Sequence, residues 1–173
     1  MATDNQRSTA KLVIKRLVAI VFTSVACLCV GGIGAQAATP MSGSGTFQVT
    51  FVPVSVETAD GNTFIRFNFV ETTTGLLAGT RVGQGSLVIH PDGTLTARDS
   101  GIFTGTLGGS APGTAIGNVE VSGTFSASMG QLEVSDGTGG LTDTQAKLVA
   151  SGHAVGPTSL AGTYTGQAQL GTP

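Results

Sequence analysis

The chain has 173 residues, including 27 glycines, one tyrosine and no tryptophan, and its formal net charge is −2. Half of its eight basic residues lie before residue 17, so residues 38–173 carry four basic and nine acidic residues, a net charge of −5. Phosphate backbones and anionic lipid surfaces would repel such a domain, which argues against nucleic acid and membrane surfaces as partners.

The amino-terminal segment has the features of a secretory signal peptide. Basic residues up to Arg16 precede an uncharged apolar run over residues 17–30, and the small residues Ala35 and Ala37 follow. We expect residues 1–37 to form a signal-peptide helix that is removed, so that Ala38 begins an exported protein of the periplasm or the extracellular space. The alternatives are retention of the segment as a membrane anchor and lipid attachment at Cys27.

The remaining chain offers few metal or redox ligands. Both cysteines, Cys27 and Cys29, lie in the leader, so the exported chain has no thiol for a disulfide or a metal. Its two histidines, His90 and His153, are far apart in sequence and lack the spacing of metal ligands. We therefore expect neither a metal nor a cofactor.

Alternating apolar residues predict β-strands after a flexible linker over residues 38–44. Large side chains recur at every second position in Phe47, Val49 and Phe51, and again in residues 65–69, where Ile65, Phe67 and Phe69 share one face. Pro53 lacks an amide hydrogen and predicts an edge, a bulge or a break in the first strand. A hairpin turn is expected at Asp60-Gly61.

Further strands follow at short intervals. A polar turn is expected near residues 73–75, and Pro91-Asp92-Gly93 has the sequence of a reverse turn. The later strands are expected over residues 79–90 in two short pieces, then at 94–100, 102–107, 114–127, 129–134, 146–155 and 162–170. About eight strands with short connections predict one all-β domain over residues 45–171, either a sandwich or a closed barrel.

Glycine, threonine and aromatic motifs carry a family resemblance. They are Gly-Leu-Leu-Ala-Gly-Thr at 75–80, Phe-Thr-Gly-Thr-Leu-Gly-Gly at 103–109, Gly-Thr-Phe at 123–125 and Asp-Gly-Thr-Gly-Gly-Leu at 136–141. The pattern resembles bacterial domains of unknown function in the allene oxide cyclase-like barrel superfamily, and it is similar to dirigent proteins. The resemblance implies an eight-stranded antiparallel up-and-down β-barrel with a central cavity, and no defined reaction. Gly101 departs from the pattern, which has a carboxylate two residues before the aromatic at Phe103.

Four residues are candidates for a ligand site. Arg66 and Asn68 share the polar face of a strand, where they point either to solvent or into a polar patch of the cavity. Glu71 either contributes to the ligand site or pairs with Arg66 across or along the sheet, which would be a structural role. Tyr164 either presents its hydroxyl to a ligand or packs with that hydroxyl satisfied.

Three functions are open at this stage. The first is an exported protein that binds a small apolar ligand in its barrel without turnover, because no set of catalytic residues is recognisable. The second is an allene oxide cyclase-like or dirigent-like isomerase or cyclase that acts by positioning its substrate, and it requires a carboxylate or tyrosine in a cavity of a few hundred Å³. The third is a surface-assembly subunit with a free strand or groove. Oligomers are compatible with all three.

Overall fold

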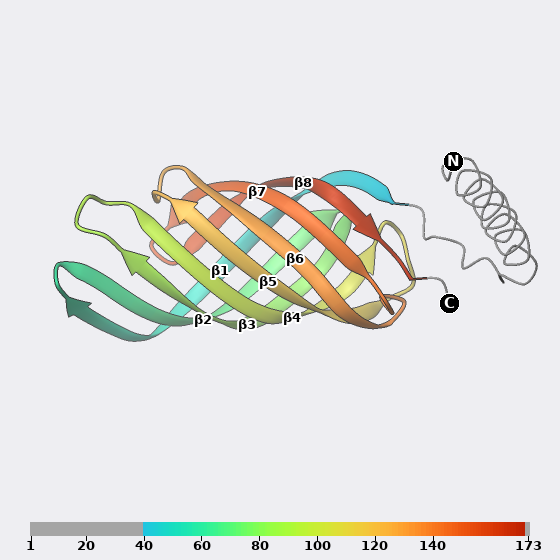
Figure 1. Ribbon diagram of the computed structural model, residues 1–173, viewed down its shortest axis with the longest axis horizontal. Helices are drawn as coiled ribbons and strands as arrows, with labels where there is room; N and C mark the ends of the chain where they lie inside the picture. Colours follow the sequence, from blue (N-terminus) through green and yellow to red (C-terminus); the bar gives the residue numbers. More distant parts are fainter. Residues whose placement is uncertain (1–39, 172–173) are drawn as a thin grey trace, which may run out of the picture. The chain divides into compact units, whose positions relative to one another are not determined.

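A computed structural model describes residues 40–171, which form eight antiparallel strands in a closed barrel whose neighbours follow the order of the chain (Figure 1). The prediction of an all-β domain is confirmed. The predicted signal peptide and its cleavage residues Ala35, Ala37 and Ala38 lie outside the described residues. Within residues 40–171, no helix is long and apolar enough to cross a membrane.

The strands are long, and each pairs with its two neighbours, β1 closing the sheet against β8. Their bounds are β1 Met41–Ala59, β2 Asn62–Gly75, β3 Leu77–Ile89, β4 Leu95–Leu107, β5 Gly113–Gly123, β6 Ser128–Gly139, β7 Gln145–Gly156 and β8 Ser159–Gln169.

Several strands extend beyond their predicted limits. β1 begins at Met41, which pairs with Ala168, so residues 41–44 belong to the sheet although a linker was expected there. β3 is one continuous strand where two pieces were expected, and β4 likewise runs through Gly101 without a break. Local propensity is low at these glycines and serines, but backbone pairing on both sides of each strand overrides it.

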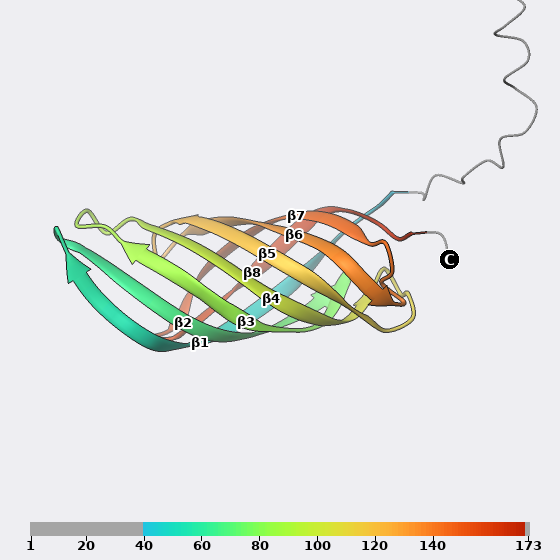
Figure 2. The same ribbon diagram turned by 60° about the horizontal axis from the view of Figure 1, so that its bottom comes forward.

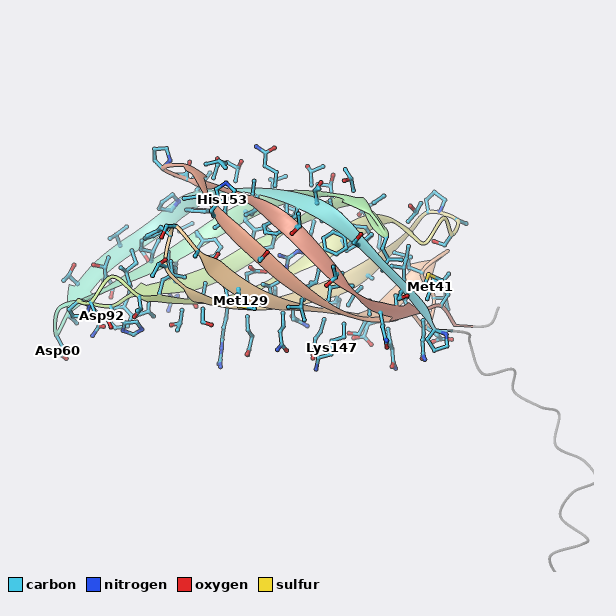
Figure 3. The ribbon with its side chains drawn as sticks, turned by 90° about the horizontal axis from the view of Figure 1, so that it is seen from above. Met41, Asp60, Asp92, Met129, Lys147 and His153 are labelled. Atoms are coloured by element: carbon cyan, nitrogen blue, oxygen red, sulfur yellow. The ribbon has the colours of Figure 1, made fainter. Side chains whose placement is uncertain are left out.

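One end of the barrel has uneven hairpins. The β1–β2 and β3–β4 hairpins project beyond the β5–β6 and β7–β8 hairpins (Figures 1 and 2), and Asp60 and Asp92 mark their tips in Figure 3. The expected turn at Asp60-Gly61 is present, with positive φ at both residues. A contact of 2.9 Å between His90 Nδ1 and Asn62 Oδ1 joins the two projecting hairpins.

Pro53 interrupts β1 as the sequence predicted. The register between β1 and β2 shifts between Pro53 and Ser55, which is a β-bulge. β1 pairs with β8 as far as Thr50, and its last bond on that side runs from the Phe51 amide to the Thr158 carbonyl. Beyond that point, β1 pairs only with β2 among the described residues.

Glycines face the interior in a continuous row. Phe69, Gly83, Gly101 and Gly117 are successive cross-strand partners on β2, β3, β4 and β5. A Cβ at Gly101 would lie 2.8 Å from Phe69 Cζ, so the absence of a side chain lets the Phe69 ring lie against the backbone. An interior just wide enough for side chains therefore holds large rings only where neighbouring strands contribute glycine.

Tyr164 on β8 reaches across β1 to the connection between β2 and β3. Its hydroxyl accepts a hydrogen bond from the Leu77 amide at 2.8 Å. The same hydroxyl donates a hydrogen bond to the carbonyl oxygen of Thr74 at 2.9 Å or of Leu77 at 3.0 Å. The phenol passes over Gly45, the cross-strand partner of Tyr164 on β1. This side chain links the first, second, third and last strands.

Replacing Gly45 with alanine tests this crossing. The new Cβ would overlap the Thr74 carbonyl oxygen and the Tyr164 hydroxyl, so we expect the free energy of unfolding to fall by about 1–3 kcal/mol, as for an overpacked core. Urea unfolding measures the loss. Gly156→Ala is the control, because the nearest atom there is Ser159 Cβ at 3.7 Å. Equal stability of the two variants would contradict the crossing.

Candidate functional site

The four sequence candidates separate into two groups. Arg66 and Asn68 face outward and are exposed, whereas Glu71 and Tyr164 face inward and are buried. Glu71 does not contact Arg66. It pairs instead with Arg81, its direct cross-strand partner on β3. The interior therefore contains a polar cluster that only two of the four candidates share.

Arg81 is the centre of that cluster. Its side chain is 4% exposed and its guanidinium lies between two carboxylates. Arg81 Nε donates to Glu71 Oε2 at 2.7 Å, and Nη2 lies 2.6 Å from the same oxygen. Arg81 Nη1 donates to Asp99 Oδ1 at 2.5 Å and to the Gly117 carbonyl at 3.2 Å. A buried charge is stable only when it is paired and hydrogen-bonded in this way.

The glycine row makes room for this arginine. A Cβ at Gly117 would lie 2.9 Å from Arg81 Cδ, so the arginine stem occupies the space that a side chain would fill. The guanidinium carbon lies 4.5 Å from the centre of the Phe69 ring, within the range of a cation–π interaction. Packing against Gly117 and Phe69 thus fixes the position of the arginine side chain, and the two carboxylates fix the orientation of its guanidinium.

The cluster carries more negative than positive charge. With both carboxylates ionised, Glu71, Arg81 and Asp99 sum to one negative charge. Burial raises the pKa of Asp99 to about 6, against the opposing effect of Arg81 and together with a smaller contribution from the Glu71 charge. Burial also raises the pKa of Tyr164, although the backbone bond at Leu77 lowers it in part. Asp99 is therefore the group in the interior that titrates near neutral pH.

A small chamber of about 80 Å³ lies beside the cluster. Its lining includes Glu71, Arg81, Asp99 and Tyr164, the hydroxyl residues Thr73 and Ser128, and a larger number of apolar side chains, among them Phe47, Val49, Val119, Val121, Leu132 and Leu160. Within residues 40–171, neither Glu71 Oε1 nor Asp99 Oδ2 takes part in a hydrogen bond. Neither oxygen is a fully buried polar atom without a partner. These oxygens remain available as acceptors. In the part of the chain that the structure describes, no cluster of three potential metal ligands occurs.

Sequence reasoning missed Arg81 and Asp99. In β3 and β4, both residues fall on the same alternating positions as the inward glycines, such as Gly83 and Gly101. The position of a residue relative to these glycines was therefore a usable signal, because in β3 glycine occupies as many inward positions as apolar residues do. The carboxylate expected at Gly101 is replaced by an inward carboxylate at Asp99, two residues earlier.

The fold and the cluster define a closed antiparallel eight-stranded domain with a buried ionic centre. A similar solved structure is a protein of unknown function from the DUF3224 family of Shewanella oneidensis MR-1. The two chains are 17% identical and superpose with a TM-score of 0.62 over 78% of this chain and all of that one, which establishes a shared fold. No family model matches the sequence, and the search of curated proteins gives no match.

The raised pKa of Asp99 predicts a pH dependence of stability. The folded state holds the proton up to about pH 6, whereas the unfolded chain releases it near its ordinary value of 3.8. The stabilisation is therefore complete below pH 3.8 and is lost as the pH rises through 6. Between pH 4 and pH 7, we expect the free energy of unfolding to fall by about 2 kcal/mol from this group.

Urea unfolding at one-unit pH intervals measures this change, and Asp99→Asn is the comparison. The variant has no proton to lose, so its stability is expected to vary less with pH by that amount. Identical pH profiles of the two proteins would show that Asp99 keeps an ordinary pKa.

Removal of the guanidinium tests the compensation of charge. In Arg81→Met, two carboxylates remain buried without a partner, and we expect a loss of about 3–5 kcal/mol in the free energy of unfolding. The matched control is Arg98→Met, because Arg98 pairs with Glu120 at 3.3 Å on the exposed surface, where such pairs contribute less than about 1 kcal/mol. Similar losses in both variants would contradict a special role for Arg81.

Proposed function

We propose that this chain is an exported binding protein that holds a small, largely apolar molecule with a hydrogen-bond-donating or cationic head group, without chemical turnover. One observation carries the proposal: apolar side chains and the ionic cluster of Glu71, Arg81 and Asp99, which has surplus negative charge, line the same interior chamber. Such a combination of apolar lining and a few convergent polar groups is typical of ligand sites.

The charge and hydrogen-bonding groups of the ionic cluster limit which head groups a ligand can have. The charge of Arg81 is already matched by Glu71 and Asp99, so an anionic ligand finds no unpaired positive charge to neutralise it. The free acceptors Glu71 Oε1 and Asp99 Oδ2 suit an ammonium or a hydroxyl group. A ligand carboxylate would instead be repelled.

The volume limits the body of the ligand. An engineered apolar cavity of about 150 Å³ in another protein binds benzene, and the chamber has about half that volume, 80 Å³. A short alkyl chain of roughly three to five heavy atoms matches this space. Larger ligands require movement of wall residues such as Phe47 or Leu160.

An isomerase or cyclase related to the allene oxide cyclase-like superfamily is the second candidate. The pKa of about 6 at Asp99 favours it, because an acid or base that titrates near neutral pH is suited to proton transfer. The strand number and antiparallel closure are those that the resemblance implies. We rank it below binding because the chamber of about 80 Å³ is smaller than a substrate pocket of a few hundred Å³.

Short primary amines test the proposal. We expect n-propylammonium at millimolar concentrations to raise the melting temperature of the purified protein in proportion to its affinity, and n-propanol to do so more weakly. Propionate has the same body and the opposite charge, and we expect it to have no effect. Differential scanning calorimetry measures the shifts, and two-dimensional NMR locates the perturbed residues.

Two variants sharpen the test. Asp99→Asn is expected to weaken binding of the amine at least tenfold, and Glu133→Gln, on the outer surface, to leave it unchanged. An absence of any shift with amines and alcohols up to about 100 mM would overturn the proposal, as would equal binding of propionate.

A further inference from the structure

The outer surface carries a continuous apolar row that the interior site does not use. Val70, Val82, Ile102 and Ile116 are successive cross-strand partners on β2, β3, β4 and β5, all facing outward. Their side chains are between 40% and 61% exposed. These strands lie side by side in Figure 2. Single exposed apolar residues are common, but four in direct contact across four strands form a patch.

The rows on both sides of this patch are polar but uncharged. On one side lie the threonines Thr72, Thr80, Thr104 and Thr114, which are again cross-strand partners. The other side has the amide and hydroxyl residues Asn68, Gln84, Ser100 and Asn118. We call these three rows on β2–β5 the uncharged face.

Charged residues begin at the border of this face. The next row beyond the amides contains Arg66, Arg98 and Glu120, and Arg98 pairs with Glu120 at 3.3 Å. An apolar centre with a neutral polar surround, and with charge beyond the amide row, is an arrangement found at protein–protein interfaces.

We propose that the uncharged face binds a second copy of this chain. A two-fold contact sets the same surface against itself, so a surface without charged residues brings no like charges together. In a domain with a net charge of −5, this face is therefore one on which two copies meet with little local repulsion. Threonine and amide rows donate and accept equally, and they satisfy each other in a self-contact. A basic or acidic partner would instead select a charged surface.

The area of the face sets the strength of the contact. Strands about 4.8 Å apart and rows about 7 Å apart give about 400 Å² for three rows on four strands. Standard interfaces bury about 800 Å² on each partner. The contact covers about half of that area, which is the size of a weak, transient association.

The free edge of β1 is the less suitable surface for self-association. Val52 and Val54 are exposed there, but Pro53 supplies no amide hydrogen and the bulge at Pro53–Ser55 distorts the edge. Proteins use both devices to prevent pairing between sheet edges.

Sedimentation velocity of the purified protein over about 10 µM to 1 mM tests the proposal. We expect a monomer–dimer equilibrium that strengthens as salt is raised from about 50 to 500 mM, because salt screens the repulsion between two acidic copies. Ile102→Glu and Ile102→Lys are both expected to weaken the dimer at least tenfold. Val149→Glu changes an exposed apolar residue on β7, outside the face, and is expected to leave it intact.

Circular dichroism and urea unfolding establish that the variants fold like the original chain, as expected for exposed positions. A monomer at every concentration would overturn the proposal. So would equal weakening by Val149→Glu, or a dimer strengthened by Ile102→Lys, which would show that net charge rather than this face controls association. None of these outcomes depends on ligand binding in the chamber.

Discussion

The narrow interior of a closed eight-stranded sheet is the constraint on which the other features depend. Such a sheet encloses little more than its own side chains, so every large inward group needs space from its neighbours. Phe69 lies over Gly101 and Arg81 lies over Gly117 because those positions have no Cβ. Tyr164 crosses β1 at Gly45 for the same reason. The glycines are therefore part of the packing, and they determine where aromatic and charged residues are placed.

The buried ionic cluster follows from this packing. Because Gly117 makes room for Arg81, the guanidinium lies in an interior with little solvent. Residues on adjacent strands must therefore balance its charge. Glu71 and Asp99 provide that balance from β2 and β4, one on each side of β3. Burial disfavours the charged form of Asp99 more than Arg81 favours it, so the pKa of Asp99 is raised despite the salt bridge, and the Glu71 charge adds a smaller effect in the same direction. The cluster that affects stability is thus also the one on which the proposed ligand preference rests.

The sequence predicted the elements better than the site. Alternation over Ile65, Phe67 and Phe69 gave the correct inward face of β2, and Pro53 marked a bulge that exists. The glycines in β3 and β4 led to breaks where the strands are continuous, because propensity is local and pairing is not. The sequence analysis considered a structural pair between Arg66 and Glu71, across or along the sheet. The structure gives that role to Arg81, because cross-strand register brings residues together that no local pattern relates.

The two faces of the sheet show how one alternating pattern separates two kinds of interaction. Inward positions of β2–β5 combine glycine, aromatic and ionic residues, and outward positions of the same strands form the uncharged rows. A charge on the outer rows would be solvated and inexpensive, so its absence there contrasts with Arg98, Glu120, Glu133 and Lys147, which are exposed on neighbouring rows and strands. A charged group inside is costly unless it is paired, yet the interior contains three. Charged residues are thus present in the interior, where they are costly, and absent from the outer rows, where they would be solvated. The stability of the sheet alone does not explain either feature. These two features are the ones from which we propose binding of a small molecule inside the sheet and of a second copy of the chain outside it.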